Sequence, residues 1–373
     1  MAASGFQQVA IHTPYPSPFA MLNFYPGPSK VYPQIRDFMV MAYDEGLLSI
    51  PHRSERFVHM MRELVGLLRK KLNIPQDYYL FFTSSATECW EIITQSLTPH
   101  KSLHLYNGAF GEKWGQYARR LRPDCYSQSF GVNDVLDVPN IPVEDDTDVI
   151  CVTQNETSNG TQVSMETLLK LQNQFKDPLL AVDATSSMAG LNLKFIRADI
   201  WFASVQKCFG LPAGMAVLVC SPRTVQRAKA LNDKKHYNSL VFLYEKMLNY
   251  QTGHTPNVLN LYLMRQMLER LPLIKQVDQQ LVKRSQELYS FFEELTEVQL
   301  LVENPEVRSQ TVLAVQGTGK QILEIKKNAA AQGITLGNGY GDWAKNTFRI
   351  ANFPAIVDGE YDVLKDFFRK NYK

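Results

Sequence analysis

Apolar runs alternate with amphipathic stretches through the first two thirds of the chain, and this pattern predicts its elements. After Ser54, apolar residues recur at spacings of three and four, so they share one helical face: Phe57, Met60, Met61, Leu64 and Leu68. Ser54 is a candidate N-cap, and Asn73-Ile-Pro75 ends the helix. We therefore predict one amphipathic helix between these two signals.

Short apolar runs predict a set of buried strands. They fall at 78–82, 102–106, 148–153, 179–183, 198–203 and 214–220. Helix-like stretches such as 161–175 separate most of them. Strands that alternate with helices predict an α/β fold, with a mainly parallel sheet flanked by helices. In such sheets the ligand lies at the carboxyl ends of the strands.

Beyond residue 272 the residue pattern changes, because helical patterns rich in charged residues become dominant. Helices are expected at 276–296, 320–332 and 359–372, with short strands at 298–302, 310–315 and 347–351. The predicted organisation is an N-terminal arm (1–30), a large domain (31–272) and a smaller C-terminal α+β domain (273–373). A long helical region at 258–296 would bridge the two domains.

Composition excludes several classes of protein. The 373 residues are 45% hydrophobic and 20% charged, with a formal net charge of +2, which gives no support for a nucleic-acid partner. No apolar run reaches the roughly 20 residues that a membrane span needs. The first eight residues lack the features of a signal peptide. Five cysteines without Cys-x-x-Cys spacing predict neither a disulfide framework nor a metal site, so we expect a cytoplasmic protein.

Lys207 and Asp183 are the strongest candidates for chemistry. Each lies at or just past the end of an apolar strand, where a charged side chain is costly unless it has a partner. One explanation covers both: the lysine would form a Schiff base with pyridoxal phosphate (PLP), and the aspartate would pair with the pyridinium nitrogen. The alternative, a surface lysine and a turn aspartate, is favoured if these two residues are considered alone.

Three polar segments follow predicted strands and could complete such a site. Thr83–Thr87 leads into a helix N-terminus, where small residues and the helix dipole favour a phosphate, although Ser85 and Glu88 also have capping-box spacing. Phe110 could stack on a flat ring or be a core aromatic. Thr157 could bond the phenolic oxygen of the ring or belong to a polar turn.

Seven weak motifs occur in one order, and together they resemble the phosphoserine aminotransferases, members of the class V, fold-type I PLP aminotransferases. The resemblance covers nearly the whole chain. The motifs are Asn23-Phe-Tyr-Pro-Gly-Pro28, Ile50-Pro-His-Arg-Ser-Glu-Arg-Phe57, Leu72-Asn-Ile-Pro75, Asn155-Glu-Thr-Ser-Asn-Gly160, Val182-Asp-Ala-Thr-Ser-Ser187, Phe202-Ala-Ser-Val-Gln-Lys-Cys-Phe-Gly210 and His254-Thr-Pro256.

The resemblance implies roles at the matching positions. Lys207 would hold PLP and move the substrate proton, while Asp183, Thr157 and Phe110 would contact the ring nitrogen, the phenolic oxygen and the ring face. The implied phosphate ligands are Ala86, Thr87 and Gln206, with His254 and Thr255 reaching in from the other subunit of a homodimer. The implied substrate ligands are Arg349, for the α-carboxylate, and His52 and Arg53, for the distal anionic group.

The chain departs from the family pattern where a Gly-His-Arg segment usually helps to hold the substrate phosphate. Residues 337–346 contain neither His nor Arg, and Lys345 is the candidate substitute. The expected reaction converts 3-phosphohydroxypyruvate and glutamate into phosphoserine and 2-oxoglutarate. Because of the departure, transamination of another small amino acid such as serine or alanine stays open. A desulfurase, a nucleotide-binding module and a catalytically inactive relative are weaker alternatives.

Overall fold

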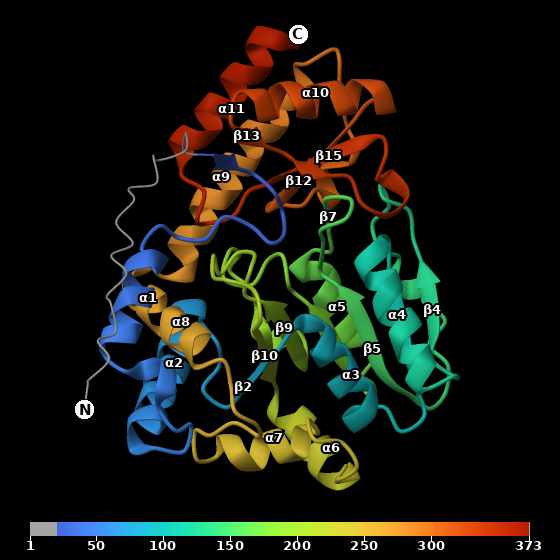
Figure 1. Ribbon diagram of the computed structural model, residues 1–373. Coiled ribbons are helices and arrows are strands. Elements are labelled where there is room, and N and C mark those ends of the chain that lie inside the picture. Colours follow the sequence, from blue (N-terminus) through green and yellow to red (C-terminus); the bar gives the residue numbers. More distant parts are fainter. Residues whose placement is uncertain (1–20, 373) are drawn as a thin grey trace, which may run out of the picture.

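The computed structural model describes residues 21–372, and a seven-stranded sheet is its central element (Figure 1). The strand order is β2–β10–β9–β8–β5–β3–β4. All neighbouring pairs are parallel except those of β10, which runs antiparallel to both β2 and β9. The strands are β2 (Tyr79–Thr83), β3 (Lys101–Tyr106), β4 (Tyr126–Ser129), β5 (Thr147–Thr153), β8 (Leu179–Asp183), β9 (Ile200–Ser204) and β10 (Ala216–Cys220).

Helices cover both faces of this sheet, as the sequence predicts. Alternate residues of one strand enter two separate cores: Leu180 and Val182 of β8 pack into one, and Leu179 and Ala181 into the other. The first core is shared with α2 (Glu55–Leu72), α5 (Met165–Gln174) and α8 (Val258–Arg270). The second is shared with α3 (Ala86–Leu97), α4 (Ala109–Leu121), α6 (Pro222–Leu231) and α7 (Leu240–Met247). The fold class is therefore confirmed.

The predicted end signals of α2 are confirmed, whereas those of α3 are confirmed only in part. The Ser54 hydroxyl accepts the Phe57 N–H at 3.3 Å, and Asn73 ends α2 with a left-handed φ of 58°. Ser85 caps α3 by accepting the Glu88 N–H. The Glu88 carboxylate does not return this bond to Ser85. It accepts the N–H and the hydroxyl of Ser84 instead, so the reciprocal half of the capping box is wrong.

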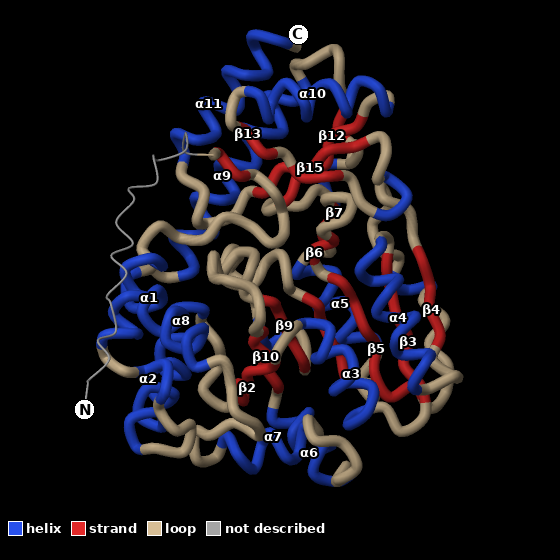
Figure 2. The backbone as a smooth tube through the Cα atoms, viewed as in Figure 1, coloured by secondary structure: helices blue, strands red, loops and turns tan. Residues whose placement is uncertain are grey.

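A second, four-stranded sheet lies beyond the first and is built from the C-terminal residues (Figure 2). Its order is β11 (Gln299–Leu300), β12 (Val312–Gln316), β15 (Thr347–Ala351) and β14 (Gly337–Asn338). It is accompanied by α9 (Ile274–Glu293), α10 (Gly319–Ala331) and α11 (Asp358–Asn371). The predicted helical region at 258–296 is interrupted between α8 and α9, where Pro272 cannot continue a helix. The domain boundary near residue 272 stays a prediction.

The first described residues pack against the C-terminal part of the chain. Strand β1 (Leu22–Asn23) pairs in parallel with β13 (Ile334–Thr335), and the Phe24 carbonyl accepts the Ala351 N–H at 2.8 Å. The segment then crosses to the large sheet, where the Ser29 N–H donates to the Gln206 carbonyl at 2.9 Å. Of the predicted arm, residues 1–20 lie outside the described part of the chain. No helix among residues 21–372 has the length and apolar character to cross a membrane.

Candidate active site

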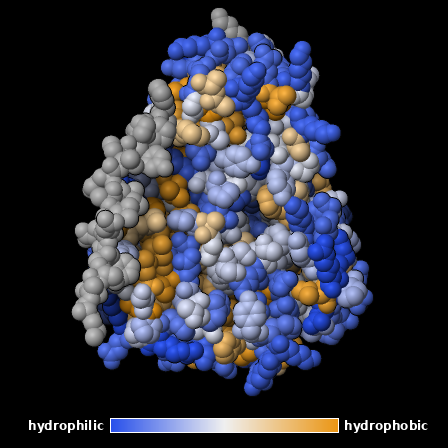
Figure 3. All heavy atoms as spheres, in the orientation of Figure 1, coloured by the Kyte–Doolittle hydropathy of each residue, from blue (hydrophilic) through white to orange (hydrophobic). Residues whose placement is uncertain are grey.

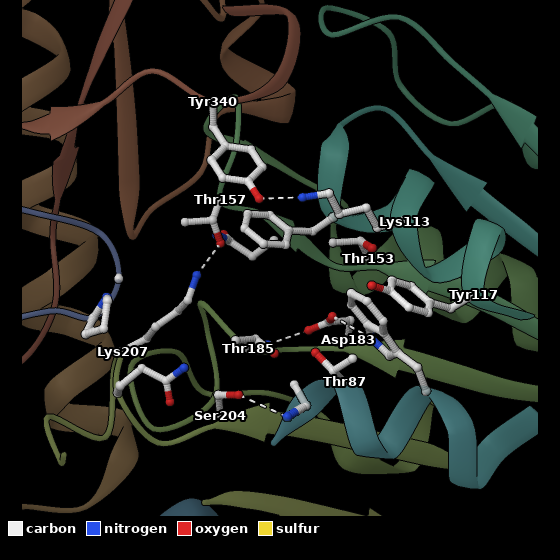
Figure 4. Close-up of a pocket in the computed structure, with 17 residues that line it drawn as sticks. Thr87, Lys113, Tyr117, Thr153, Thr157, Asp183, Thr185, Ser204, Lys207 and Tyr340 are labelled. Atoms are coloured by element: carbon white, nitrogen blue, oxygen red, sulfur yellow. Dashed lines mark hydrogen bonds between the residues drawn. The ribbon is translucent and has the colours of Figure 1, made fainter. Parts of the chain in front are cut away.

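A cavity of about 370 Å³ lies at the carboxyl ends of β2, β5, β8 and β9 (Figure 4). It is the location that the sheet topology predicts for a ligand. Seven of the sequence-predicted site residues line it: Ala86, Thr87, Phe110, Thr157, Asp183, Gln206 and Lys207. The structure therefore brings together residues spread over more than a hundred positions of sequence.

Lys207 extends into the cavity from the turn after β9 (Figure 4). Its Nζ donates to the Thr157 hydroxyl at 2.7 Å and to the Ser186 hydroxyl at 3.2 Å. Burial lowers the pKa of Lys207 to about 8, and the nearby Arg349 charge adds to this effect; Asp183 and Glu156 oppose it. The neutral amine is therefore far more abundant near neutral pH than for an exposed lysine, and a nucleophile or general base requires this form.

Asp183 ends β8 at the floor of the cavity and is buried. One carboxylate oxygen accepts the Thr185 N–H at 2.9 Å, and the other accepts Trp90 Nε1 at 3.4 Å. Burial raises the pKa of Asp183, while the hydrogen bonds from Thr185 and the charge of Lys207 lower it. A cationic ring nitrogen beside this carboxylate would favour its charged form further.

The N-terminus of α3 forms another wall of the cavity. Ala86 and Thr87 begin this helix, and the Ala86 N–H donates to the Ser204 hydroxyl at 3.0 Å. Gln206 also lines this cavity, and its Oε1 is buried without a hydrogen-bond partner among the described residues. A helix N-terminus with polar side chains beside it is suited to bind a phosphate.

Phe110 is positioned by the first turn of α4. The Glu156 carboxylate accepts the N–H groups of Phe110 and Gly111, both at 3.1 Å, and so caps this helix. The Phe110 ring stacks on Tyr340 with centroids 4.9 Å apart and an interplanar angle of 16°. Lys207 Nζ lies 5.2 Å from the centroid of the Phe110 ring. An aromatic face therefore lies beside the lysine, where a flat cofactor ring is expected.

Arg349 is buried in β15 next to the cavity. Its Nε donates to the Asn338 carbonyl at 2.6 Å, and Nη1 donates to the Thr157 carbonyl at 2.7 Å. The guanidinium carbon lies 5.5 Å from the centroid of the Tyr340 ring. Thr157 and Tyr340 both line the cavity, so Arg349 contacts two of its walls.

Besides Arg349, which lies next to the cavity, four predicted residues do not line the cavity of their own chain. His52, Arg53, His254 and Thr255 lie elsewhere, and Arg53 donates to Gln251 at 3.4 Å. His52 and His254 are neighbours: burial lowers the pKa of His52, and the charges of Arg53 and His254 lower it further. The predicted role of His254 and Thr255 at the cavity of a partner subunit stays a prediction, and so does the predicted role of His52 and Arg53 at the distal anionic group of the substrate.

Lys345 is exposed and does not line the cavity. Its predicted place as a substitute for the missing arginine is not supported, because the turn after Trp343 directs this part of the segment to the surface. Tyr340, from the same segment, lines the cavity instead.

Several residues in or beside the cavity were not predicted from the sequence. Trp90 bonds Asp183, Ser186 bonds Lys207, and Lys113 and Tyr340 contact each other. Spacing could have indicated two of them, since Trp90 lies one helical turn after Ala86 and Lys113 nearly one turn after Phe110.

All five cysteines are free and buried, and no group of His, Cys, Asp or Glu within residues 21–372 is arranged to hold a metal ion.

Comparison with known proteins agrees with this fold and cavity. Residues 22–342 match the aminotransferase class-V family, and the chain belongs to that family. The chain is thus an aminotransferase, which agrees with the family resemblance stated above. A phosphoserine aminotransferase from Corynebacterium glutamicum is 28% identical over 351 residues, which cover 91% of each chain.

The chain is also similar to solved structures of aminotransferases. The crystal structure of a phosphoserine aminotransferase from Cytophaga hutchinsonii is 30% identical, with a TM-score of 0.89 over 94% of this chain and 99% of that one. The alanine–glyoxylate aminotransferase of a Nostoc species is 21% identical and has a TM-score of 0.80, over 96% of each chain. At that identity the second likeness concerns the fold alone.

Proposed function

We propose that this protein is a PLP-dependent aminotransferase that converts 3-phosphohydroxypyruvate and glutamate into phosphoserine and 2-oxoglutarate. The observation that carries the proposal is the buried pair of Lys207 and Asp183 in one cavity, beside the N-terminus of α3. The likeness to the phosphoserine aminotransferases of Corynebacterium glutamicum and Cytophaga hutchinsonii supports this choice of substrate.

The residues of the cavity fit PLP. Two buried side-chain oxygens in its wall have no hydrogen-bond partner among the described residues, namely those of Thr153 and Gln206. Gly27 leaves room beside the lysine, because a Cβ at this position would lie 3.2 Å from Lys207 Cε. A polar, roomy cavity with a free amine and a buried carboxylate matches the donor and acceptor groups of this cofactor.

Lys207 would attach PLP, Asp183 would pair with its ring nitrogen, Phe110 would cover its ring, and Ala86, Thr87 and Gln206 would contact its phosphate. When bound, PLP supplies an electron sink that stabilises negative charge at the substrate Cα and carries the amino group between substrates.

The protein's own residues would supply the remaining chemistry. Lys207 would remove and return the proton at the substrate Cα, and its lowered pKa keeps part of the amine neutral for this step. Arg349 would bind the α-carboxylate, since a guanidinium pairs with a carboxylate through two parallel hydrogen bonds. The bonds from Arg349 to Asn338 and Thr157 would orient the guanidinium toward this carboxylate.

We further propose a homodimer in which His52, Arg53, His254 and Thr255 serve the cavity of the partner. Exposed apolar side chains on α1 (Ile35–Asp44) support this assembly: Met39, Val40, Met41 and Tyr43 are all exposed. Figure 3 shows apolar side chains on the side of the molecule where α1 and α8 lie. Burying these side chains between two subunits would remove apolar surface from water.

The cysteines bear on the cellular compartment. Five free buried cysteines support a reducing compartment, the cytoplasm.

The test of this function is the visible absorption of the purified protein after addition of PLP. We expect a band from bound PLP that is lost in Lys207→Ala and that bleaches when phosphoserine or glutamate is added. Bleaching by alanine or serine alone would retain the aminotransferase and reject phosphoserine as the substrate. Bleaching by alanine or serine alone is the outcome that corresponds to the missing Gly-His-Arg segment, because that segment usually helps to hold the substrate phosphate.

A further inference from the structure

A lysine and a tyrosine meet at the rim of the cavity, on the side opposite Lys207 (Figure 4). Lys113 extends from α4, and its Nζ donates to the Tyr340 hydroxyl. The same nitrogen lies 4.7 Å from the centroid of the Tyr340 ring and 5.8 Å from that of Phe110. Both side chains are half-buried. Two distant parts of the chain therefore place an ammonium group and a phenol at one point of the cavity wall.

The ammonium group of Lys113 is not neutralised by the protein. Its interactions within residues 21–372 are with the Tyr340 hydroxyl and the two aromatic rings, and no ion pair is among them. The acids nearest the cavity are engaged, since Asp183 accepts from Thr185 and Trp90, and Glu156 caps α4. A partly desolvated cation without a counterion attracts an anion more strongly than an exposed one does.

The hydroxyl of Tyr340 can supply a second donor. Because the Lys113 ammonium donates to the phenol oxygen, the O–H proton of Tyr340 is available to another acceptor. An ammonium group that donates to a hydroxyl oxygen lies directly beside the O–H proton of that hydroxyl, and the two form a compact pair of donors. Such a pair can bind a phosphate or a carboxylate, since lysine acts on either as a point charge.

We propose that Lys113 and Tyr340 bind the second anionic group of the substrate, a phosphate or a side-chain carboxylate. This inference rests on the proposed function and names the part of the chain that replaces the missing Gly-His-Arg segment. Arg349 would hold the α-carboxylate, and Lys113 would hold the other end of the same molecule. The Phe110 centroid lies 5.2 Å from Lys207 Nζ and 5.8 Å from Lys113 Nζ, so both nitrogens are near the same ring. The two ammonium groups are therefore close enough for one small substrate to lie between them.

A purely structural role predicts a different result. If the contact only fastened residues 337–346 against α4, its loss would disturb every substrate alike, including those with a single carboxylate. If Lys113 binds the second anion, substrates that lack this group would be unaffected. The two roles are separated by comparing substrates, not by activity alone.

The experiment uses the PLP-loaded enzyme and its Lys113→Met and Tyr340→Phe variants. KM and kcat are measured with glutamate, phosphoserine, alanine and serine. We expect Lys113→Met to raise KM for glutamate and phosphoserine roughly 10- to 100-fold, with little change for alanine or serine. Tyr340→Phe should give a smaller effect in the same direction. Lys345→Met removes an exposed lysine of the same segment and is the matched control, expected to behave as wild type.

A binding measurement makes the result independent of turnover. Calorimetric titration with glutarate, a dicarboxylate that has no amine, should give weaker binding to Lys113→Met than to wild type by the same factor. Equal changes for all four substrates, or unchanged glutarate binding, would overturn the inference. If wild type uses glutamate but not phosphoserine, the proposed reaction fails, and the Lys113→Met result with glutamate still decides the inference. A wild-type enzyme that uses alanine or serine alone would reject both.

Discussion

At the scale of single residues, the state of Lys207 results from opposing effects. Burial and the charge of Arg349 favour the neutral amine, whereas Asp183 and Glu156 favour the ammonium form. Desolvation is the largest effect, so the pKa of Lys207 falls from its ordinary value of 10.5 to about 8. The same burial that makes a charged lysine costly thereby makes it reactive.

The pH dependence of PLP loading tests whether the pKa of Lys207 is lowered in this way. Only the neutral amine can attach PLP, so the loading rate of cofactor-free protein should rise about tenfold per pH unit below a pH of about 8 and level off above it. Stopped-flow absorbance measures this rate. Arg349→Met should move the midpoint to higher pH, because it removes a positive charge that disfavours the ammonium form. A midpoint near the ordinary lysine value in wild type would contradict the interpretation.

The sequence predicted those cavity residues that belong to a recognisable motif at the end of a strand. Lys207, Asp183, Thr157 and Phe110 all line one cavity because each lies at or shortly after the carboxyl end of a strand of the same sheet. Lys113 and Tyr340 could not be predicted as a pair, since one lies on α4 and the other lies between β14 and β15. Their meeting depends on how the two sheets pack, which no local pattern encodes.

At the scale of elements, helix α4 depends on a close contact at its start. A Cβ on Gly108 would lie 2.3 Å from Glu156 Cγ, and the Glu156 carboxylate is the group that caps this helix. Glycine at this position therefore allows the cap to form. Because Phe110 and Lys113 both lie on α4, this cap also positions two walls of the cavity.

We predict that Gly108→Ala destabilises the protein by about 2–4 kcal/mol, since the new methyl group displaces the buried Glu156 carboxylate. Gly66→Ala is the matched control. Gly66 lies within α2, and a Cβ there would meet nothing within 4 Å, so this change should stabilise the protein by about 0.5–1 kcal/mol. Urea unfolding of both variants measures the difference. Equal stabilities would show that Glu156 can move without cost.

The elements show what patterns of hydrophobicity can and cannot predict. The buried strands β8, β9 and β10 were found because each is a continuous apolar run. The antiparallel direction of β10 was not predicted from this pattern, because a buried antiparallel strand has the same composition as its parallel neighbours. The short connection from Ser204 to Ala216 was the available signal, since it leaves no room for a crossover helix. Strand β4 was missed because Tyr126-Ser-Gln-Ser129 has no apolar run.

At the scale of the whole molecule, the position of His52 and Arg53 bears on the assembly. Neither residue lines the cavity of its own chain, although the family resemblance assigns both to the substrate. A homodimer resolves this if each subunit supplies these residues to the other. The exposed apolar side chains on α1 offer one surface for such contact.

Mixed dimers test this arrangement. Lys207→Ala and Arg53→Ala should each be nearly inactive as homodimers. Their co-expression should restore about a quarter of wild-type activity, since half of randomly assorted dimers are mixed and each has one intact site. Activity assays on the co-expressed and separately expressed proteins measure this. If Arg53 served its own chain, both sites of every mixed dimer would carry a defect and no activity would return.

The contact between Gly27 and Lys207, together with the place of Tyr340 in the cavity wall, has a consequence for synthesis on the ribosome. The wall combines residues from near both ends of the chain, and β1 needs β13 as its partner. A nascent chain can form the large sheet early, since domains fold as their residues emerge. It cannot close the cavity until residue 340 has left the exit tunnel. A chain truncated before residue 340 would therefore lack one wall of the cavity around its reactive lysine.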